Sequence, residues 1–101
     1  MLEFTFDGVL WIYEGKAKIH FVTVPDDISG SIKAFVAGPR RGWGAVKVSV
    51  QIGQTRWRTS IFPIDKGKSF ILPIKAEVRK AEELEEGSCP TVFLSVEPDL
   101  V

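Results

Sequence analysis

The sequence lacks several features that would point to a disulfide, a metal or a membrane. It has one cysteine, Cys89, and one histidine, His20, which excludes an internal disulfide and a zinc cluster of Cys and His. No apolar run reaches the roughly 18 residues that a membrane-spanning helix needs. The segment MLEFTFDG carries acidic residues where a signal peptide has basic ones, so we expect no export signal. A cytoplasmic, reducing setting is therefore predicted.

The sequence also lacks net charge, because 13 basic and 13 acidic side chains cancel. Whole-molecule electrostatics therefore favours neither nucleic acid nor an anionic membrane, and any attraction to a polyanion requires a local patch. Hydrophobic residues make up 45% of the chain and charged residues 26%, which is typical of a folded globule. At 101 residues, we expect a single domain over residues 1–101.

No catalytic signature is present. The serines occur in no GxSxG or SxxK context, and the glycines match no phosphate-binding loop. A structural role is sufficient for each residue that could take part in chemistry. We expect Asp26 or Asp27 to cap the start of a helix, His20 to lie on the surface or rim of a strand, and Cys89 to lie in a turn. We therefore expect no catalytic residue, no metal site and no cofactor.

The first half of the chain predicts strands and one helix. Leu2, Phe4 and Phe6 alternate with polar residues, as in a half-buried strand. Asp7-Gly8 is a turn pair that can supply a positive φ, after which VLWIYE could return as a second strand. The run AKIHFVTV predicts a third strand, which Pro25 ends because it has no N–H for the ladder. Ile28, Ile32, Phe35 and Val36 then recur at helical spacing, and Gly30 predicts that this helix is short.

A similar unit recurs later in the chain. SFILP predicts a strand ended by Pro73, 48 positions after Pro25, and a charged helix from about Ile74 follows it. Ile74, Val78, Ala81 and Leu84 form its apolar stripe, while Arg79 is expected to pair with Glu82 and Glu83, and Glu77 with Lys80. Each unit is followed by a glycine and a valine-rich strand. The two units predict an architectural repeat and a closed or pseudo-closed barrel with helices over its ends.

The clearest local signal is a hairpin, AVKVSVQI-GQ-TRWRTSIF. The Gly-X pair predicts a type II′ turn, and a two-residue loop sets Val50 opposite Trp57 and Val46 opposite Ile61 on the core side. The opposite face is then polar and carries three cations and no acid: Lys47, Ser49, Gln51, Arg56, Arg58 and Ser60.

These motifs resemble a known family. The strings RRGWGAVKVSVQIGQTRWRTSIFP and FILPIKAEVRK, followed by an LEEG turn, are similar to the bacterial family catalogued as domain of unknown function 1905, over about Phe4 to Glu97. The resemblance implies a double-split β-barrel, a fold shared with swapped-hairpin antitoxins and transition-state regulators, which bind DNA as dimers. Family members usually have Gly-Asp where this chain has Gly87-Ser88, which affects the local turn rather than the fold. The predicted fold class is thus mainly β: a small barrel of about six to eight strands with two short helices.

We predict a non-enzymatic binding or scaffold module whose ligand, if it has one, is a small anionic group. Cations beside an aromatic suit such a ligand, and they gather in the hairpin and the loop before it: Arg40, Arg41, Trp43, Lys47, Arg56 and Arg58. One alternative is a nucleic-acid-binding regulator, which zero net charge disfavours. Another is an enzyme with a small-molecule site in the barrel mouth, which requires a pocket lined by His20 or by paired carboxylates. A monomer is favoured over a dimer, since two units in one chain can complete a barrel.

Overall fold

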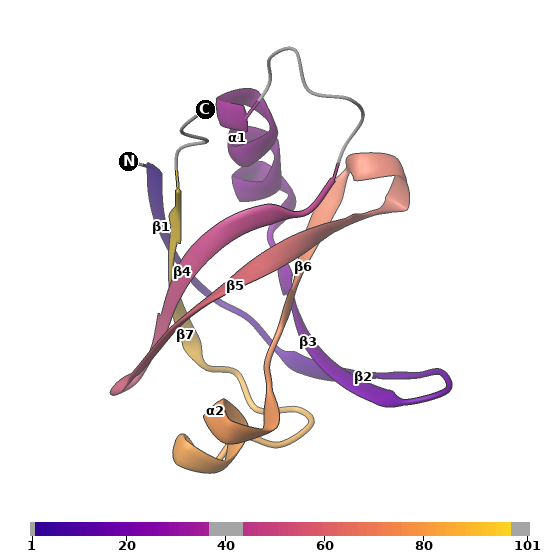
Figure 1. The fold of residues 1–101 in the computed structure, drawn as a ribbon, viewed down its shortest axis with the longest axis vertical. Coiled ribbons are helices and arrows are strands. Elements are labelled where there is room, and N and C mark those ends of the chain that lie inside the picture. The colour runs from indigo at the N-terminus through magenta and orange to yellow at the C-terminus, as the bar shows by residue number, and fades with distance from the viewer. Residues whose placement is uncertain (1, 37–43, 98–101) are drawn as a thin grey trace.

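The computed structural model describes residues 2–36 and 44–97, and it confirms the mainly β fold. The described strands form one antiparallel sheet of seven, in the order β1-β7-β4-β5-β6-β3-β2, which curls into a half-barrel (Figure 1). The described elements are β1 (Leu2–Asp7), β2 (Leu10–Glu14), β3 (Lys18–Val24), α1 (Asp26–Val36), β4 (Val46–Ile52), β5 (Thr55–Ile64), the 3-10 turn η1 (Asp65–Gly67), β6 (Ser69–Pro73), α2 (Ala76–Ala81) and β7 (Thr91–Val96).

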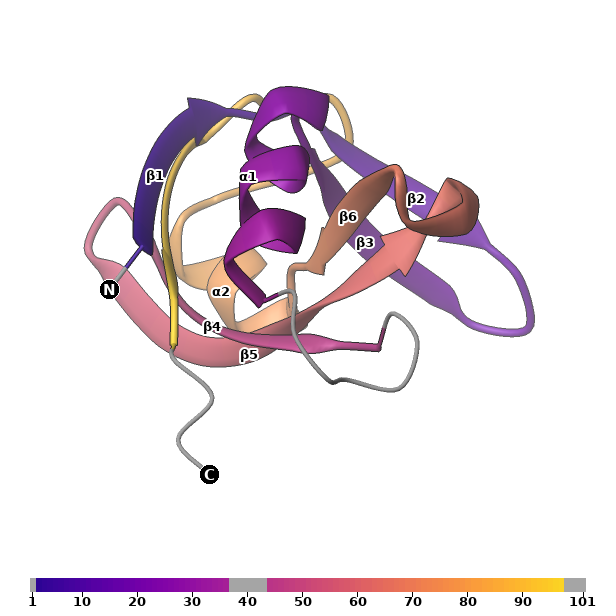
Figure 2. The same ribbon diagram turned by 90° about the horizontal axis from the view of Figure 1, so that it is seen from above.

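The strands of the two strand–proline–helix units, β3 and β6, are neighbours in this sheet. β3 and β6 pair antiparallel, with Val22 opposite Leu72, so the helices that follow them leave in opposite directions. As a result α1 lies across one end of the curled sheet and α2 lies at the other end (Figures 1 and 2). α1 runs for 11 residues despite Gly30, which is exposed. The described chain has no helix that is long and apolar enough to cross a bilayer.

α2 begins two residues later than the sequence predicted. Lys75 is its N-cap residue, yet Ile74 is still buried and Val78 is the buried residue of the helix. Ala81 is exposed, contrary to the predicted stripe, whereas Leu84 packs against the core from beyond the end of the helix. Glu83, with a φ of 54°, turns the backbone there. The apolar stripe is therefore shorter than the helical spacing suggested.

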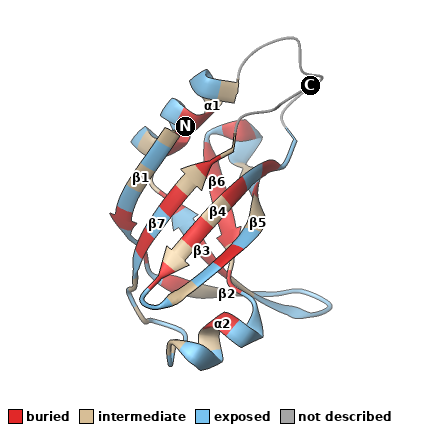
Figure 3. Cartoon of the chain, turned by 60° about the vertical axis from the view of Figure 1, so that its left-hand side comes forward, coloured by how far each residue is buried: buried red, intermediate tan, exposed pale blue. Residues whose placement is uncertain are grey.

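The β4–β5 hairpin has the predicted register and faces. Val50 pairs with Trp57 and Val46 with Ile61, and all four side chains are buried. Gly53 has a positive φ of 57°, and Gln54, the second residue of the turn, does not have a positive φ. A type II′ turn requires this combination. Buried and less buried positions consequently alternate along β4 (Figure 3).

The Asp7-Gly8 segment is a corner of the sheet and not a hairpin turn. β1 pairs with β7 and β2 pairs with β3, so β2 does not fold back on β1. Gly8 has no positive φ, and its role is close approach: an added Cβ would lie 2.3 Å from Cγ1 of Val22. Backbone hydrogen bonds connect this corner to the segment before β7, including Gly8 N–H to Pro90 O at 3.1 Å and Leu10 N–H to Ser88 O at 2.8 Å.

The core fills the inside of the curled sheet and is closed by both helices. Its largest fully buried side chains include Phe70, Leu10, Ile32, Ile61 and Leu72. Ser29 of α1 is buried among them, where its hydroxyl donates to Val24 O and accepts from Phe70 N–H, at 3.2 and 3.1 Å. These two hydrogen bonds hold α1 against β3 and β6.

Candidate functional site

The structure separates the residues that the sequence grouped into one basic site. Arg40, Arg41 and Trp43 lie outside the described residues. Lys47 and Arg58 line one pocket, on the outer side of β4 and β5, whereas Arg56 lines another. The predicted outward basic face of the hairpin is therefore divided between two hollows.

Arg58 is not an unopposed cation, because Glu97 neutralises it. Its Nε donates to the Glu97 carboxylate at 2.9 Å and its Nη2 donates to the second carboxylate oxygen. Glu97 follows β7, whose pairing with β4 brings it next to this face. The ion pair is well exposed on the arginine side, so its contribution to stability is small. It occupies two of the donors of Arg58 and leaves Nη1 to reach other groups.

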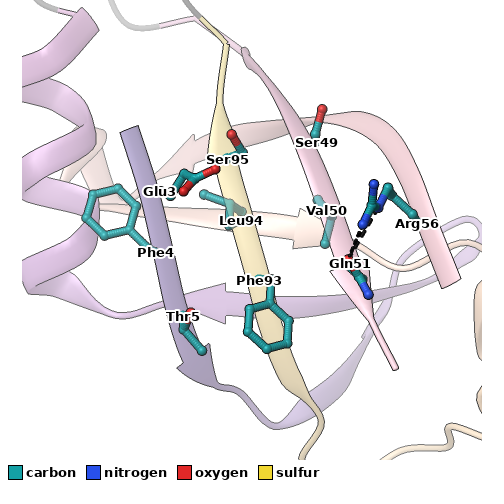
Figure 4. A pocket seen from close by; sticks show the side chains of 10 residues that line it. All are labelled: Glu3, Phe4, Thr5, Ser49, Val50, Gln51, Arg56, Phe93, Leu94 and Ser95. Atoms are coloured by element: carbon teal, nitrogen blue, oxygen red, sulfur yellow. Dashed lines mark hydrogen bonds between the residues drawn. The ribbon is translucent and has the colours of Figure 1, made fainter. Parts of the chain in front are cut away.

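Arg56 belongs to a polar trough on the outer face of β1, β7, β4 and β5 (Figure 4). Its Nη2 and Nε donate to the side-chain oxygen of Gln51 at 2.9 and 3.2 Å. Ser49 and Ser95 pair across β4 and β7, and their small side chains leave the hollow between larger neighbours. The hydroxyl of Ser95 is buried and has no hydrogen-bond partner among the described residues.

A third pocket, of about 300 Å³, contains the largest group of cations, and we call it the cationic pocket. It lies where the sheet splits. β5 pairs with β6 only from Phe62 to Ile64, while residues 18–20 of β3 pair only with β2, so residues 57–59 and 18–20 border a gap. α2 and the segment before it cover this gap. The pocket is lined by Lys18, Ile19, His20, Trp57, Arg58, Thr59, Pro73, Ile74, Lys75 and Arg79, none of which is acidic.

Arg79 is held in this pocket by two contacts. Its Nε donates to Ile74 O at 3.0 Å, and its Nη1 lies 3.4 Å from Nε2 of His20. An arginine can only donate, so Nε2 of His20 must accept, and the imidazole proton then lies on Nδ1. Nδ1 is buried and has no partner among the described residues. The geometry therefore requires a neutral His20 and leaves Nη2 of Arg79 without a described protein partner.

The electrostatics of the pocket agree with this assignment. Desolvation by burial lowers the pKa of His20 most, and the positive charge of Arg79 lowers it further. Glu86 raises the pKa by less than Arg79 lowers it, and Lys18 lowers it least. Because the positive charges outweigh that of Glu86, the pocket favours an anion and disfavours a second proton on His20. A negatively charged ligand beside His20 would reverse the balance and raise its pKa.

The donors in the cationic pocket suit an oxyanion better than a metal or a covalent reaction. Guanidinium and ammonium groups bind carboxylates and phosphates through charge-assisted hydrogen bonds. Among the described residues, no three His, Cys, Asp or Glu side chains come together to hold a metal ion. Cys89 is exposed and does not line the pocket.

Reasoning from the sequence missed most of this pocket. Arg79 was predicted to pair with Glu82 and Glu83, but its described contacts are with Ile74 and His20, 59 positions away from it in the chain. Glu82 instead accepts a hydrogen bond from the Thr55 hydroxyl at 2.6 Å. Local helical spacing could not reveal the pairing of β3 with β6 that brings His20 beside α2. One local signal existed: Lys75 and Arg79 are four residues apart in the predicted helix, a spacing that places two side chains on one helix face.

Comparison with protein families identifies a match. The profile of the family described as "Domain of unknown function (DUF1905)" matches residues 6–94 of the chain. That span contains the whole cationic pocket. No curated protein matches the sequence.

Proposed function

The chain belongs to the DUF1905 family, and we propose that its domain binds a small anionic ligand in the cationic pocket between β3, β5 and α2. The observation that carries this proposal is the lining itself: Arg79, Lys75, Lys18 and Arg58 face one hollow that has no acidic lining residue. Glu97 neutralises Arg58, but Arg79, Lys75 and Lys18 remain as like charges around the hollow, and an anion relieves their mutual repulsion.

The pocket contains groups suited to a ligand bearing a phosphate or carboxylate. Arg79 keeps Nη2 available, because its Nε is held by Ile74 O and its Nη1 faces His20. Arg58 keeps Nη1 available while Glu97 holds its other donors. Lys75 and Lys18 are exposed, so they can turn towards a bound oxyanion at little cost in burial. Of the cations predicted from sequence, Arg58 remains in the proposed site.

Binding is favoured over catalysis by the surroundings of His20. The enzyme alternative requires a pocket lined by His20 or by paired carboxylates, and His20 does line the cationic pocket. A histidine acting as general base also needs an orienting acceptor and a nucleophile, as in Ser-His-Asp arrangements. The Nε2 of His20 faces a guanidinium and its Nδ1 has no described partner.

The test is a thermal-unfolding titration with phosphate, pyrophosphate, sulfate and a dicarboxylate. A ligand at 100 times its Kd stabilises the folded state by about 2.7 kcal/mol, which raises the unfolding temperature saturably. Lys75→Ala should weaken the stabilisation, whereas Lys80→Ala removes a charge from the same helix outside the pocket and should leave it unchanged. Arg79→Gln adds a second loss variant, once its fold is checked by circular dichroism.

The same titration separates the alternatives. Stabilisation by none of these anions, or an equal loss in Lys75→Ala and Lys80→Ala, would contradict a site in the pocket. Retention on heparin that weakens steeply with salt would support the nucleic-acid alternative instead, because polyanion binding releases counterions.

A further inference from the structure

One half of the sheet has an outer face that is apolar where a β-barrel exterior is normally polar. Pairing of β5 with β6, β6 with β3, and β3 with β2 places one set of side chains on the side away from the core. We call this set the apolar outer face; it consists of Phe62, Ile71, Thr23, Phe21, Pro73, Trp11, Ile19 and Tyr13. Its one polar member, Thr23, accepts a hydrogen bond from the Trp11 indole N–H at 2.9 Å.

The other half of the sheet shows that this is not a general property of the exterior. There the outward side chains of β1, β7, β4 and β5 are mostly polar, and they include Glu3, Ser95, Ser49 and Arg58, which lie in one cross-strand row. Both halves belong to the same curled sheet. The difference in polarity is therefore specific to the half that contains β2, β3 and β6.

The apolar outer face is substantially accessible. Tyr13 is 55% exposed, Phe62 43% and Ile19 42%. In the register, Phe21 and Ile71 lie between these exposed residues and are themselves buried, and the rings of Trp11 and Phe21 are 5.3 Å apart. The β2–β3 hairpin that carries Tyr13 and Ile19 projects from the body of the molecule (Figures 1 and 2). Exposed apolar side chains gathered on one sheet face are a feature of interaction sites on soluble proteins.

The apolar outer face borders the cationic pocket directly. Ile19 and Pro73 belong to both, and Lys18 and Lys75 stand next to them in the chain and line the pocket. A partner seated on the face would thus meet positive charge at the edge next to the cationic pocket, and the Arg58–Glu97 ion pair at the edge next to Phe62. Charge complementarity selects a partner that combines apolar side chains with carboxylates.

We propose that this surface docks an acidic, apolar segment of a partner protein. Aromatic and aliphatic side chains of the segment cover Tyr13, Ile19 and Phe62, and one of its carboxylates enters the cationic pocket. Only one part of this inference rests on the proposed function: the placement of a peptide carboxylate as the anion in the cationic pocket. The apolar contact stands on the register and exposure of the face.

The experiment is selection from a random 12-residue phage-displayed peptide library, followed by fluorescence anisotropy with the enriched peptides. We expect enrichment of sequences that combine Phe, Trp or Leu with Asp or Glu. Ile19→Lys and Tyr13→Lys should each weaken binding about tenfold or more, as loss of a central apolar contact does. Phe93→Lys is the matched control, because Phe93 is 49% exposed but lies on the other half of the sheet, whose outward side chains are mostly polar.

Competition with inorganic phosphate shows which part of the proposal fails, the carboxylate contact or the apolar contact. Phosphate should compete with the peptide, and Ile19→Lys should still bind phosphate if only the apolar contact is lost. Peptide binding that depends on Ile19 but ignores phosphate and Lys75→Ala would overturn the carboxylate assignment. No enrichment, or equal binding by Ile19→Lys and wild type, would overturn the docking surface.

Two further outcomes would also overturn it. Cosedimentation with phosphatidylcholine–phosphatidylglycerol vesicles that Tyr13→Lys abolishes would assign the face to a membrane. A dimer by light scattering that Tyr13→Lys converts to a monomer would assign it to a second copy of the chain. The docking proposal predicts neither change.

Discussion

Nη1 of Arg79 lies 3.4 Å from Nε2 of His20, and this contact across two distant segments suits an imidazole nitrogen that accepts, as it does in a neutral histidine. This contact joins strand β3 to the helix that follows β6, and it exists because the two strands pair. It makes His20 a reporter of charge in the cationic pocket. The predictions about that pocket depend on this relationship.

The first prediction concerns pH. Burial and Arg79 lower the pKa of His20 in the folded state, so below a pH of about 6.5 the unfolded chain binds the proton more readily. The contribution of His20 to the free energy of unfolding is therefore fully present above that pH, and it is lost as the pH falls through the folded-state pKa. Urea unfolding of wild type and His20→Gln between pH 5 and 8 should show a difference that changes in this window. A constant difference would contradict the neutral assignment.

The second prediction concerns Glu97, which holds two donors of Arg58. Glu97→Gln removes the competing negative charge, so phosphate affinity in the cationic pocket should rise about two- to fivefold, the range of an exposed ion pair. Isothermal titration calorimetry measures the change. Glu77→Gln, which removes an acid from α2 outside the pocket lining, serves as the control and should have a smaller effect.

The third prediction concerns the buried hydroxyl of Ser29. Ser29→Ala removes the acceptor of Phe70 N–H and leaves that buried group without a partner. The expected loss is about 1–3 kcal/mol in the free energy of unfolding, measured with denaturant. Ser31→Ala, at an exposed position of the same helix, should change it by less than about 0.5 kcal/mol.

Two glycines should respond with opposite signs. Gly53 has a φ of 57°, a conformation that residues with a Cβ adopt only with strain, so Gly53→Ala should destabilise by about 1–2 kcal/mol. Gly30 lies in α1 with no described atom within 4 Å of its Cβ position, so Gly30→Ala should stabilise by about 0.5–1 kcal/mol. Thermal unfolding of both variants tests the pair, and a shift of the same sign in both would contradict it.

Much of the fold could be predicted because its signals are local. The hairpin register follows from a two-residue turn between alternating strands, and Val50 does lie opposite Trp57. Pro25 and Pro73 each mark the end of a strand before a helix. The corner at Gly8 was misjudged because a glycine suits both a positive φ and a close approach, and only the contact with Val22 distinguishes them.

The candidate site was harder to predict because its residues come from distant segments. His20, Arg58 and Arg79 belong to β3, β5 and α2, and only sheet topology brings them together. The sequence pattern suggested that the charges of α2 pair with one another within the helix. The role of Arg79 in the pocket was therefore not predicted. The hairpin cations were visible in sequence, but the ion pair of Arg58 with Glu97 depends on the pairing of β7 with β4.

Titration of the protein with inorganic phosphate, followed by the NMR signals of the His20 ring, tests the central claim most directly. His20 is the only histidine in the sequence, so its signals need no assignment among others. The account predicts saturable shifts of these signals and a raised pKa of His20 in the bound state, retained in Lys80→Ala and weakened in Lys75→Ala. Unchanged His20 signals and an unchanged pKa in the folded protein at millimolar phosphate would contradict an anion site in the cationic pocket.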